Sequence, residues 1–129
     1  MTDNRVEDYK DLIVWKRSME LSTVVYAIAK KLPKIETFAL ADQIRRSAVS
    51  IPSNIAEGYG RTTSKAYARF LSIARGSVYE LETQLILCVR LEYLEESDLA
   101  YALSLSNEII KMLNVIIPKV MKLEQQTIP

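Results

Sequence analysis

Apolar residues recur between residues 67 and 88 at alternating spacings of four and three. This spacing puts one apolar side chain on the same helical face at every turn, as in helices that pack lengthwise against other helices. Only three glycines interrupt the 129 residues, which disfavours strands joined by tight turns. The sequence therefore predicts an all-α protein. The stripe consists of Tyr67, Leu71, Ala74, Val78, Leu81, Leu85 and Cys88.

Three other segments show helical periodicity, so we expect four helices. The first is expected from about Asp11 to Leu32, the second from about Thr37 to Glu57 and the fourth from about Ser97 to Leu123, with the third opened by Thr62 or Thr63 as a cap. The stripe expected to be buried on the first helix is Leu12, Trp15, Met19, Ser22, Tyr26 and Ala29. On the second helix it is Ala41, Ile44, Ala48, Ile51 and Ile55.

The ends of these helices are marked by proline and glycine. Pro33 stops the first helix, and Gly58 is expected to end the second as a left-handed C-cap. Pro52 lies inside the second helix and removes the amide that would bond to the Ala48 carbonyl. We therefore expect a kink there. Gly76 lies within the third helix, and close approach of another helix is the expected reason.

Connections of about four to six residues between long helices make neighbouring helices antiparallel. The expected fold is an up-down-up-down four-helix bundle with a kinked second helix, formed by residues 11–124 as one domain. Residues 1–10 and 125–129 are expected to be tails.

The absence of histidine removes the commonest general base and metal ligand. Without histidine the chain cannot form Ser-His-Asp or Cys-His nucleophile systems or the usual helical metal motifs, and its single cysteine, Cys88, cannot form an intramolecular disulfide. We expect no enzyme, no metal and no cofactor. The longest stretch without charge, Ser47 to Ala56, is shorter than the ~20 residues of a membrane span, and no secretory signal follows Met1, so we expect a cytoplasmic protein.

The third and fourth helices carry apolar residues outside their main stripes. These include Ile86, Leu87 and Val89 on the third helix and Leu103, Leu105, Ile110, Met112, Ile117 and Met121 on the fourth. A monomer buries one stripe per helix, so a second stripe favours self-association. The alternative is a wide core with a few exposed leucines.

Basic residues provide the candidate nucleic-acid contacts. Arg61, Lys65 and Arg69 step by four near the start of the third helix, where positive charge opposes the helix dipole. Arg45 and Arg46 lie on the second helix, and their guanidinium groups suit phosphate. The alternatives are a solvated helix face for the first group, and pairing with Asp42, Glu57, Glu80 or Glu82 for the second.

The antiparallel topology gathers charge at one end of the bundle. The end formed by residues 11–20, 54–69 and 115–124 has seven positive and four negative side chains, net +3, whereas the opposite end, residues 25–42 and 85–104, has four positive and six negative, net −2. We expect a modestly basic rim at the Arg61 end that binds polyanions weakly and in a salt-sensitive way.

Two segments are specific enough to indicate a family. The run SIPSNIAEGYGR at residues 50–61 and the run FLSIARGSVYELETQL at residues 70–85, with DLIVWKRSMEL at residues 11–21, resemble the four-helix-bundle family known from intervening sequences of bacterial large-subunit ribosomal RNA. The resemblance covers about residues 9–123. It implies a cytoplasmic bacterial protein that forms ring-shaped homopentamers, and it brings no known reaction.

The family is similar to the accessory variability determinant of diversity-generating retroelements, a markedly basic pentamer that works with nucleic acid and a reverse transcriptase. The present chain, at net +1, departs from that basic character. We therefore predict a non-enzymatic homo-oligomeric adaptor, with RNA or a ribonucleoprotein as candidate partner through Arg45, Arg46, Arg61, Lys65 and Arg69. The alternative is a protein-protein interaction scaffold with no nucleic-acid role.

Overall fold

The computed structural model describes residues 5–127, with side chains up to residue 123. It contains four long helices and two short 3-10 helices, and the prediction of an all-α four-helix protein is confirmed. In chain order these are η1 (Tyr9–Asp11), α1 (Ile13–Ala29), η2 (Lys34–Glu36), α2 (Leu40–Tyr59), α3 (Ser64–Arg90) and α4 (Glu96–Thr127). α4 thus includes residues 125–127 of the predicted C-terminal tail.

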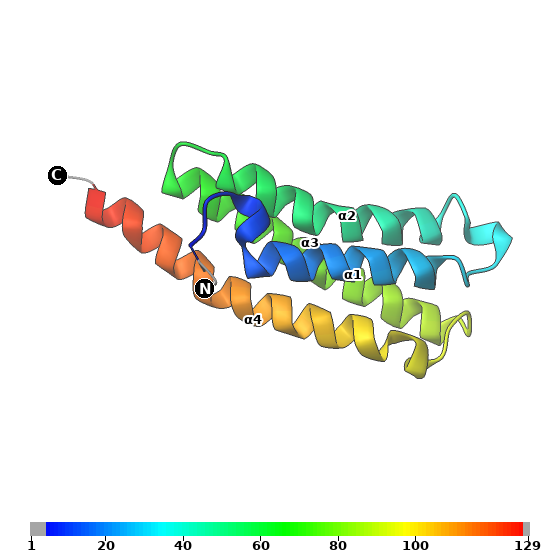
Figure 1. The fold of residues 1–129 in the computed structure, drawn as a ribbon. Coiled ribbons are helices and arrows are strands. Elements are labelled where there is room, and N and C mark those ends of the chain that lie inside the picture. The colour runs from blue at the N-terminus through cyan, green and yellow to red at the C-terminus, as the bar shows by residue number, and fades with distance from the viewer. Residues whose placement is uncertain (1–4, 128–129) are drawn as a thin grey trace.

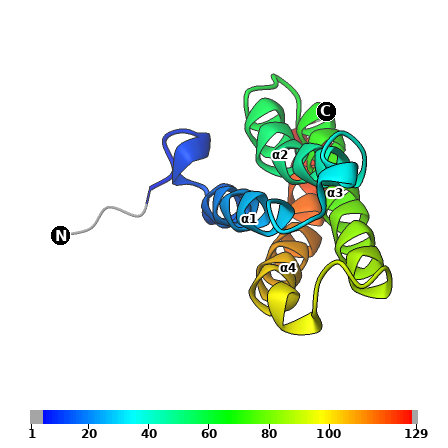
Figure 2. The same ribbon diagram turned by 90° about the vertical axis from the view of Figure 1, so that its right-hand side faces the viewer.

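The helices form an antiparallel bundle in which each packs against its neighbours in sequence (Figures 1 and 2). α1 also contacts α4, which closes the arrangement into a four-sided bundle. The connection between α1 and α2 lies at the end opposite to the connection between α2 and α3, as expected for up-down topology (Figure 1).

The core consists largely of the predicted stripes of α2, α3 and α4. All five predicted residues of α2 are buried, and so is the α3 stripe except for the half-buried Tyr67. Of the stripe predicted for α4, Leu99, Ala102, Ser106, Ile109, Leu113 and Val120 are buried, Ile116 is half-buried and Leu123 is 54% exposed. Leu105 and Ile117, predicted as part of a second stripe, are also buried within the single chain.

The stripe predicted for α1 is wrong except for Ala29, which is buried. The residues that face the core are Val14, Ser18, Leu21, Val25 and Ile28, whereas Met19 and Tyr26 are 43% and 42% exposed. Both sets of residues follow the same four-three spacing, so periodicity alone could not choose between them. A serine occupies one position of the true stripe, and its burial is tolerated because its Oγ donates to the Val14 carbonyl at 2.7 Å.

α2 runs unbroken through Pro52, and a side chain from α1 replaces the missing donor. Ser22 Oγ donates to the Ala48 carbonyl oxygen at 2.9 Å and also lies 3.0 Å from the Ser18 carbonyl oxygen. The carbonyl that Pro52 leaves unpaired in its own helix therefore links α2 to α1.

Two predicted helix caps are wrong, and α1 ends at Ala29, before the predicted Leu32. Thr37 is not the N-cap of α2, because the helix starts at Leu40, whose amide donates to Glu36 Oε1 at 3.3 Å. Gly58 is not a left-handed C-cap: it lies within α2, and no described glycine has a positive φ. By contrast, Thr63 caps α3 as predicted, its Oγ1 accepting from the Ala66 amide at 3.1 Å.

Gly58 is required by packing rather than by backbone conformation. A Cβ at this position would lie 2.6 Å from the Cβ of Phe70 on α3, which is closer than two such atoms can approach. Gly76 shows the opposite situation. Within the described part of the chain nothing lies within 4 Å of a Cβ built there, so the predicted close approach is not made by another helix of the same molecule.

One helix of the described chain, over Glu96–Leu123 of α4, is long and apolar enough to cross a membrane by length and composition alone. The core helix of a soluble bundle meets the same criterion. Here the buried stripe of α4 packs against α1 and α3.

The two glycines give a matched pair of substitutions with opposite expected effects. Gly58→Ala should lower the free energy of unfolding by about 1–3 kcal/mol, because the new methyl group collides with the rigid Cβ of Phe70. Gly76→Ala should raise it by roughly 0.5–1 kcal/mol, because alanine favours the helix and meets no neighbour. Urea unfolding followed by circular dichroism measures both, and equal effects would contradict this account of Gly58.

The bond across Pro52 can be tested with a double-mutant cycle. Ser22→Ala should cost about 1–3 kcal/mol, because it leaves the partly buried Ala48 carbonyl without a donor. In a Pro52→Ala background the amide restored at position 52 satisfies that carbonyl, so the cost of Ser22→Ala should largely disappear. Thr23→Ala, which removes an exposed hydroxyl bonded within α1, is the control. An unchanged cost in both backgrounds would show that the bond does not stabilise the bundle.

Candidate nucleic-acid interface

The five predicted cationic contacts lie in two separate groups. Arg45 and Arg46 are in the second turn of α2, near the connection to α1. Arg61 lies in the connection between α2 and α3, and Lys65 and Arg69 lie in the first turns of α3. At 1.5 Å per residue, the length of α2 separates the groups by roughly 20 Å. The five residues therefore do not form one site.

Arg45 and Arg46 both make contacts within the chain. Arg45 Nη2 donates to the Thr37 carbonyl oxygen at 3.0 Å and so holds the connection between α1 and α2. Arg46 Nε lies 2.9 Å from Asp42 Oδ2, one turn away, which is one of the pairings that the sequence suggested. Arg46 nevertheless stays exposed, with 79% of its side-chain surface accessible.

Arg61 is not part of the helical stripe predicted for α3, because that helix begins at Ser64. Its Nη2 lies 2.8 Å from Glu57 Oε1, and its guanidinium carbon lies 4.7 Å from the centre of the Phe70 ring. The side chain thus joins the end of α2 to α3 through an ion pair and a cation–π contact. Its charge is partly neutralised before any ligand arrives.

Lys65 and Arg69 are the exposed cations at the start of α3, one turn apart on one face. Among the described residues Arg69 has no ion-pair partner, and the first turn of α3 contains no acidic residue. Because α3 and α4 are antiparallel neighbours, the exposed Lys119 and Lys122 of α4 lie toward the same end of the bundle. We call the exposed pair Lys65 and Arg69 the basic rim.

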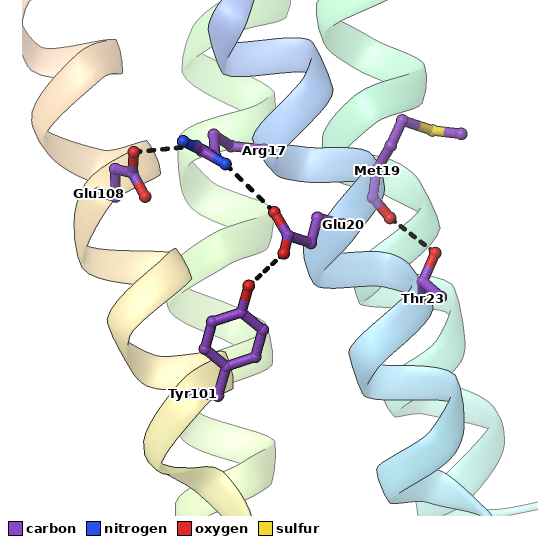
Figure 3. A network of polar contacts seen from close by, with 6 residues as sticks. All are labelled: Arg17, Met19, Glu20, Thr23, Tyr101 and Glu108. Carbon is purple, nitrogen blue, oxygen red and sulfur yellow. Dashed lines mark hydrogen bonds and ion pairs between the residues drawn. The ribbon is translucent and has the colours of Figure 1, made fainter.

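A network of polar side chains between α1 and α4 was not predicted. Arg17 Nε lies 3.0 Å from Glu108 Oε1 on α4, and its Nη1 lies 3.3 Å from Glu20 Oε2 (Figure 3). Tyr101 on α4 donates to the other oxygen of Glu20 (Figure 3). Glu108 raises the pKa of Arg17, and the hydrogen bond to Glu20 raises the pKa of Tyr101. Because these side chains are exposed, the contacts link α1 to α4 but add little stability.

α2 and α3 are joined by hydroxyl groups. Ser47 Oγ donates to Glu80 Oε1 at 2.7 Å, and the hydroxyls of Ser50 and Ser77 lie 2.8 Å apart. Asn54 Nδ2 in turn donates to the Ser50 carbonyl at 2.7 Å. These bonds give Asn54 a structural role beside the contact between α2 and α3.

The single cysteine is placed in the core. Cys88 is fully buried, and this burial, with a smaller contribution from Glu36, raises the pKa of its thiol to about 11. A protonated, inaccessible thiol cannot act as a nucleophile. Among the described residues no group of three or more Cys, Asp or Glu side chains is arranged to hold a metal ion.

The fold and its surface define an all-α four-helix bundle with a small cationic rim at one end. The sequence pattern of the 23S rRNA-intervening sequence protein family matches residues 10–115, and the chain belongs to that family.

The structure is also similar to a crystal structure from Bacteroides thetaiotaomicron, described as a protein of unknown function from the S23 ribosomal protein family. The TM-score is 0.76 at 30% identity, over 81% of this chain and 98% of that one. No curated protein matches the chain.

The pKa of Cys88 leads to a prediction about its reactivity. At pH 8 the native protein should react with a thiol reagent such as 5,5′-dithiobis(2-nitrobenzoate) at least about 100-fold more slowly than the urea-unfolded chain, because the buried thiol stays protonated. Absorbance at 412 nm measures both rates. Fast reaction of the folded protein would place Cys88 in an accessible, ionised environment.

Proposed function

We propose that the protein is a non-enzymatic adaptor that works as a homo-oligomer, in agreement with the pentameric rings implied by the family resemblance. The observation that carries this proposal is the outer surface of the bundle. The core is complete within one chain, yet large apolar side chains remain exposed on every helix. Those on α3 and α4 include Ile73, Tyr79, Ile86, Leu87, Tyr101, Val115 and Met121. Covering them by other copies stabilises an assembly.

The oligomer binds RNA or a ribonucleoprotein through the basic rim. Lys65 and Arg69 support this proposal because both are exposed where the α3 dipole favours an anion. Arg61 contributes less, since Glu57 and Phe70 already engage it. The name of the family and its similarity to the accessory variability determinant of diversity-generating retroelements favour nucleic acid as the polyanion. A ring repeats the rim in every copy, so weak single contacts add together.

A purely protein-binding scaffold is the second candidate function. It is favoured by the internal engagement of Arg45, Arg46 and Arg61, which leaves few cations for phosphate. Its partner would dock on exposed apolar surface, and its affinity would depend little on salt. The two candidates therefore differ in one measurable property.

A titration with RNA at several salt concentrations tests the proposed function. The oligomer should bind a fluorescent structured RNA with an affinity that falls steeply with salt, and Lys65→Ala with Arg69→Ala should reduce the slope of log K against log salt by about 1.5 per subunit engaged. Arg46→Ala removes one exposed cation from the other group and is the control for each single rim substitution, Lys65→Ala or Arg69→Ala.

A DNA duplex of equal length shows whether the rim distinguishes RNA. Absence of binding even at low salt would contradict the nucleic-acid role and favour the scaffold. An equal loss with Arg46→Ala would show that binding depends on overall charge and not on the rim.

A further inference from the structure

The connection between α1 and α2 carries the two most exposed large apolar side chains of the described residues. Ile35 is 83% exposed and Phe38 is 93% exposed. They lie three residues apart at the end of the bundle where α1 turns into α2 (Figure 1). We call this pair the knob. An aromatic and an aliphatic side chain held out in water by a single-chain fold indicate a contact that the single chain does not make.

The knob is held by polar contacts from several elements. Arg45 of α2 donates to the carbonyl of Thr37, the residue next to Phe38. Glu36, the residue next to Ile35, accepts from the Leu40 amide at 3.3 Å and from the Tyr93 hydroxyl at 2.8 Å. The backbone that presents the knob is therefore fixed from α2 and from the connection between α3 and α4. Such preorganisation lowers the entropy lost on docking.

A groove on the side of the bundle offers a surface of matching character. It has a volume of about 920 Å3 and lies between the N-terminal segment, the start of α1 and the middle of α4. Its apolar surface includes Ile13 and Val115, which are 62% and 55% exposed. The remaining apolar lining residues are Val6, Leu12, Val14, Met112 and Ile116.

Each of the three elements that border the groove contributes a cation. These are Arg5 from the N-terminal segment, Lys16 from α1 and Lys111 from α4. The one carboxylate, Asp11, accepts the Glu7 and Asp8 amides at 2.9 and 3.2 Å through a single oxygen, which lowers its pKa. The groove therefore has an apolar floor and a basic border.

The end of the bundle that carries the knob has a net negative charge of −2, because residues 25–42 and 85–104 hold six carboxylates against four cations, Lys30, Lys31, Lys34 and Arg90. Beside the knob, the connection between α3 and α4 and the start of α4 carry Glu92, Glu95, Glu96 and Asp98, of which Asp98 is paired with Lys31. The knob and the groove thus match in both apolar character and charge. They lie toward opposite ends of α1, so one chain cannot bring its own knob into its own groove (Figure 1).

We infer that the Ile35 and Phe38 knob of one copy inserts into the α1–α4 groove of the next copy. The two contact surfaces are different patches of the same chain, so the contact is heterologous, and repeating it closes a ring when the rotation between copies fits. The inference rests on the proposed self-association and names the surfaces that produce it. A long-chain carboxylate would match the groove less well than a second copy does, because its single negative charge can pair with only one of the three cations that border the apolar floor of the groove.

Two variants that remove exposed side chains test the inference. The first, Ile35→Ser with Phe38→Ser, lacks the knob, and the second, Ile13→Glu with Val115→Glu, blocks the groove. All four native side chains are more than half exposed, so helical content should be unchanged. Sedimentation velocity should give the unaltered protein at five times the 14.7 kDa of one chain. Each variant should sediment as a monomer, its association weakened roughly 100-fold or more.

Mixing the variants gives the decisive result. The first retains a groove and the second retains a knob, so an equimolar mixture should form a heterodimer that cannot grow further. Thr83→Ala, which removes an exposed hydroxyl of α3 outside both surfaces, is the control and should keep the full assembly. If a groove variant fails to fold, Lys16→Glu with Lys111→Glu tests the same surface by charge alone.

Each contrary outcome has a distinct meaning. Variants that keep the mass of the unaltered protein would overturn the knob-in-groove contact while leaving self-association intact. Variants that are monomeric and stay monomeric on mixing would overturn the pairing of these two surfaces. A monomeric unaltered protein would contradict the proposed oligomer itself, and with it this inference.

Discussion

The close contact between α2 and α3 at Gly58 determines the geometry of the basic end. With no side chain at this position, the backbone of α2 approaches the Cβ of Phe70 to a distance that alanine would not allow. This places the Phe70 ring at the junction of the two helices, under the guanidinium group of Arg61. Glu57 completes the arrangement one turn before Arg61. A packing constraint in the core thus fixes a charged side chain on the surface.

The same contact explains why the cations at this end differ in how readily they can bind a phosphate. Arg61 bonds to groups of its own chain, so binding a phosphate with it would require exchanging an existing ion pair for a new one. Lys65 and Arg69 project from α3. Among the described residues Arg69 has no ion pair that a phosphate would have to replace. The working surface on our proposal is therefore smaller than the sequence suggested. Its strength depends on repetition across copies rather than on the charge of one chain.

Much of the fold could be predicted from the sequence because three helices have one dominant stripe each. The stripes of α2 from Ala41 to Ile55 and of α3 from Leu71 to Cys88 keep an unbroken spacing of three and four, and their residues are buried as expected. α1 has two stripes of equal period. Its larger side chains, Met19 and Tyr26, lie at the surface, while smaller branched ones fill the space between α2 and α4.

The candidate site was less predictable, because it depends on contacts between residues distant in sequence. Spacing by four placed Arg61 on a helix with Lys65 and Arg69, but the chain leaves the helix between Gly60 and Ser64. The donor for the Ala48 carbonyl was likewise not predictable, because Ser22 supplies it from another helix. No local pattern around Pro52 contains that information. The knob could not be recognised either, since Ile35 and Phe38 would look equally natural as buried residues.

The two proposed surfaces draw on different charges, and this separation makes them compatible. Arg5, Lys16 and Lys111 border the groove, so docking of the knob brings the carboxylates beside it to these cations and offsets positive charge on the side of the bundle. The basic rim lies at the start of α3 and takes no part in that contact. Assembly therefore reduces the basic character of the flank while it leaves the rim unchanged, so a polyanion meets the rim and no longer meets the groove. On this account, self-association does not compete with nucleic-acid binding but confines it to one surface.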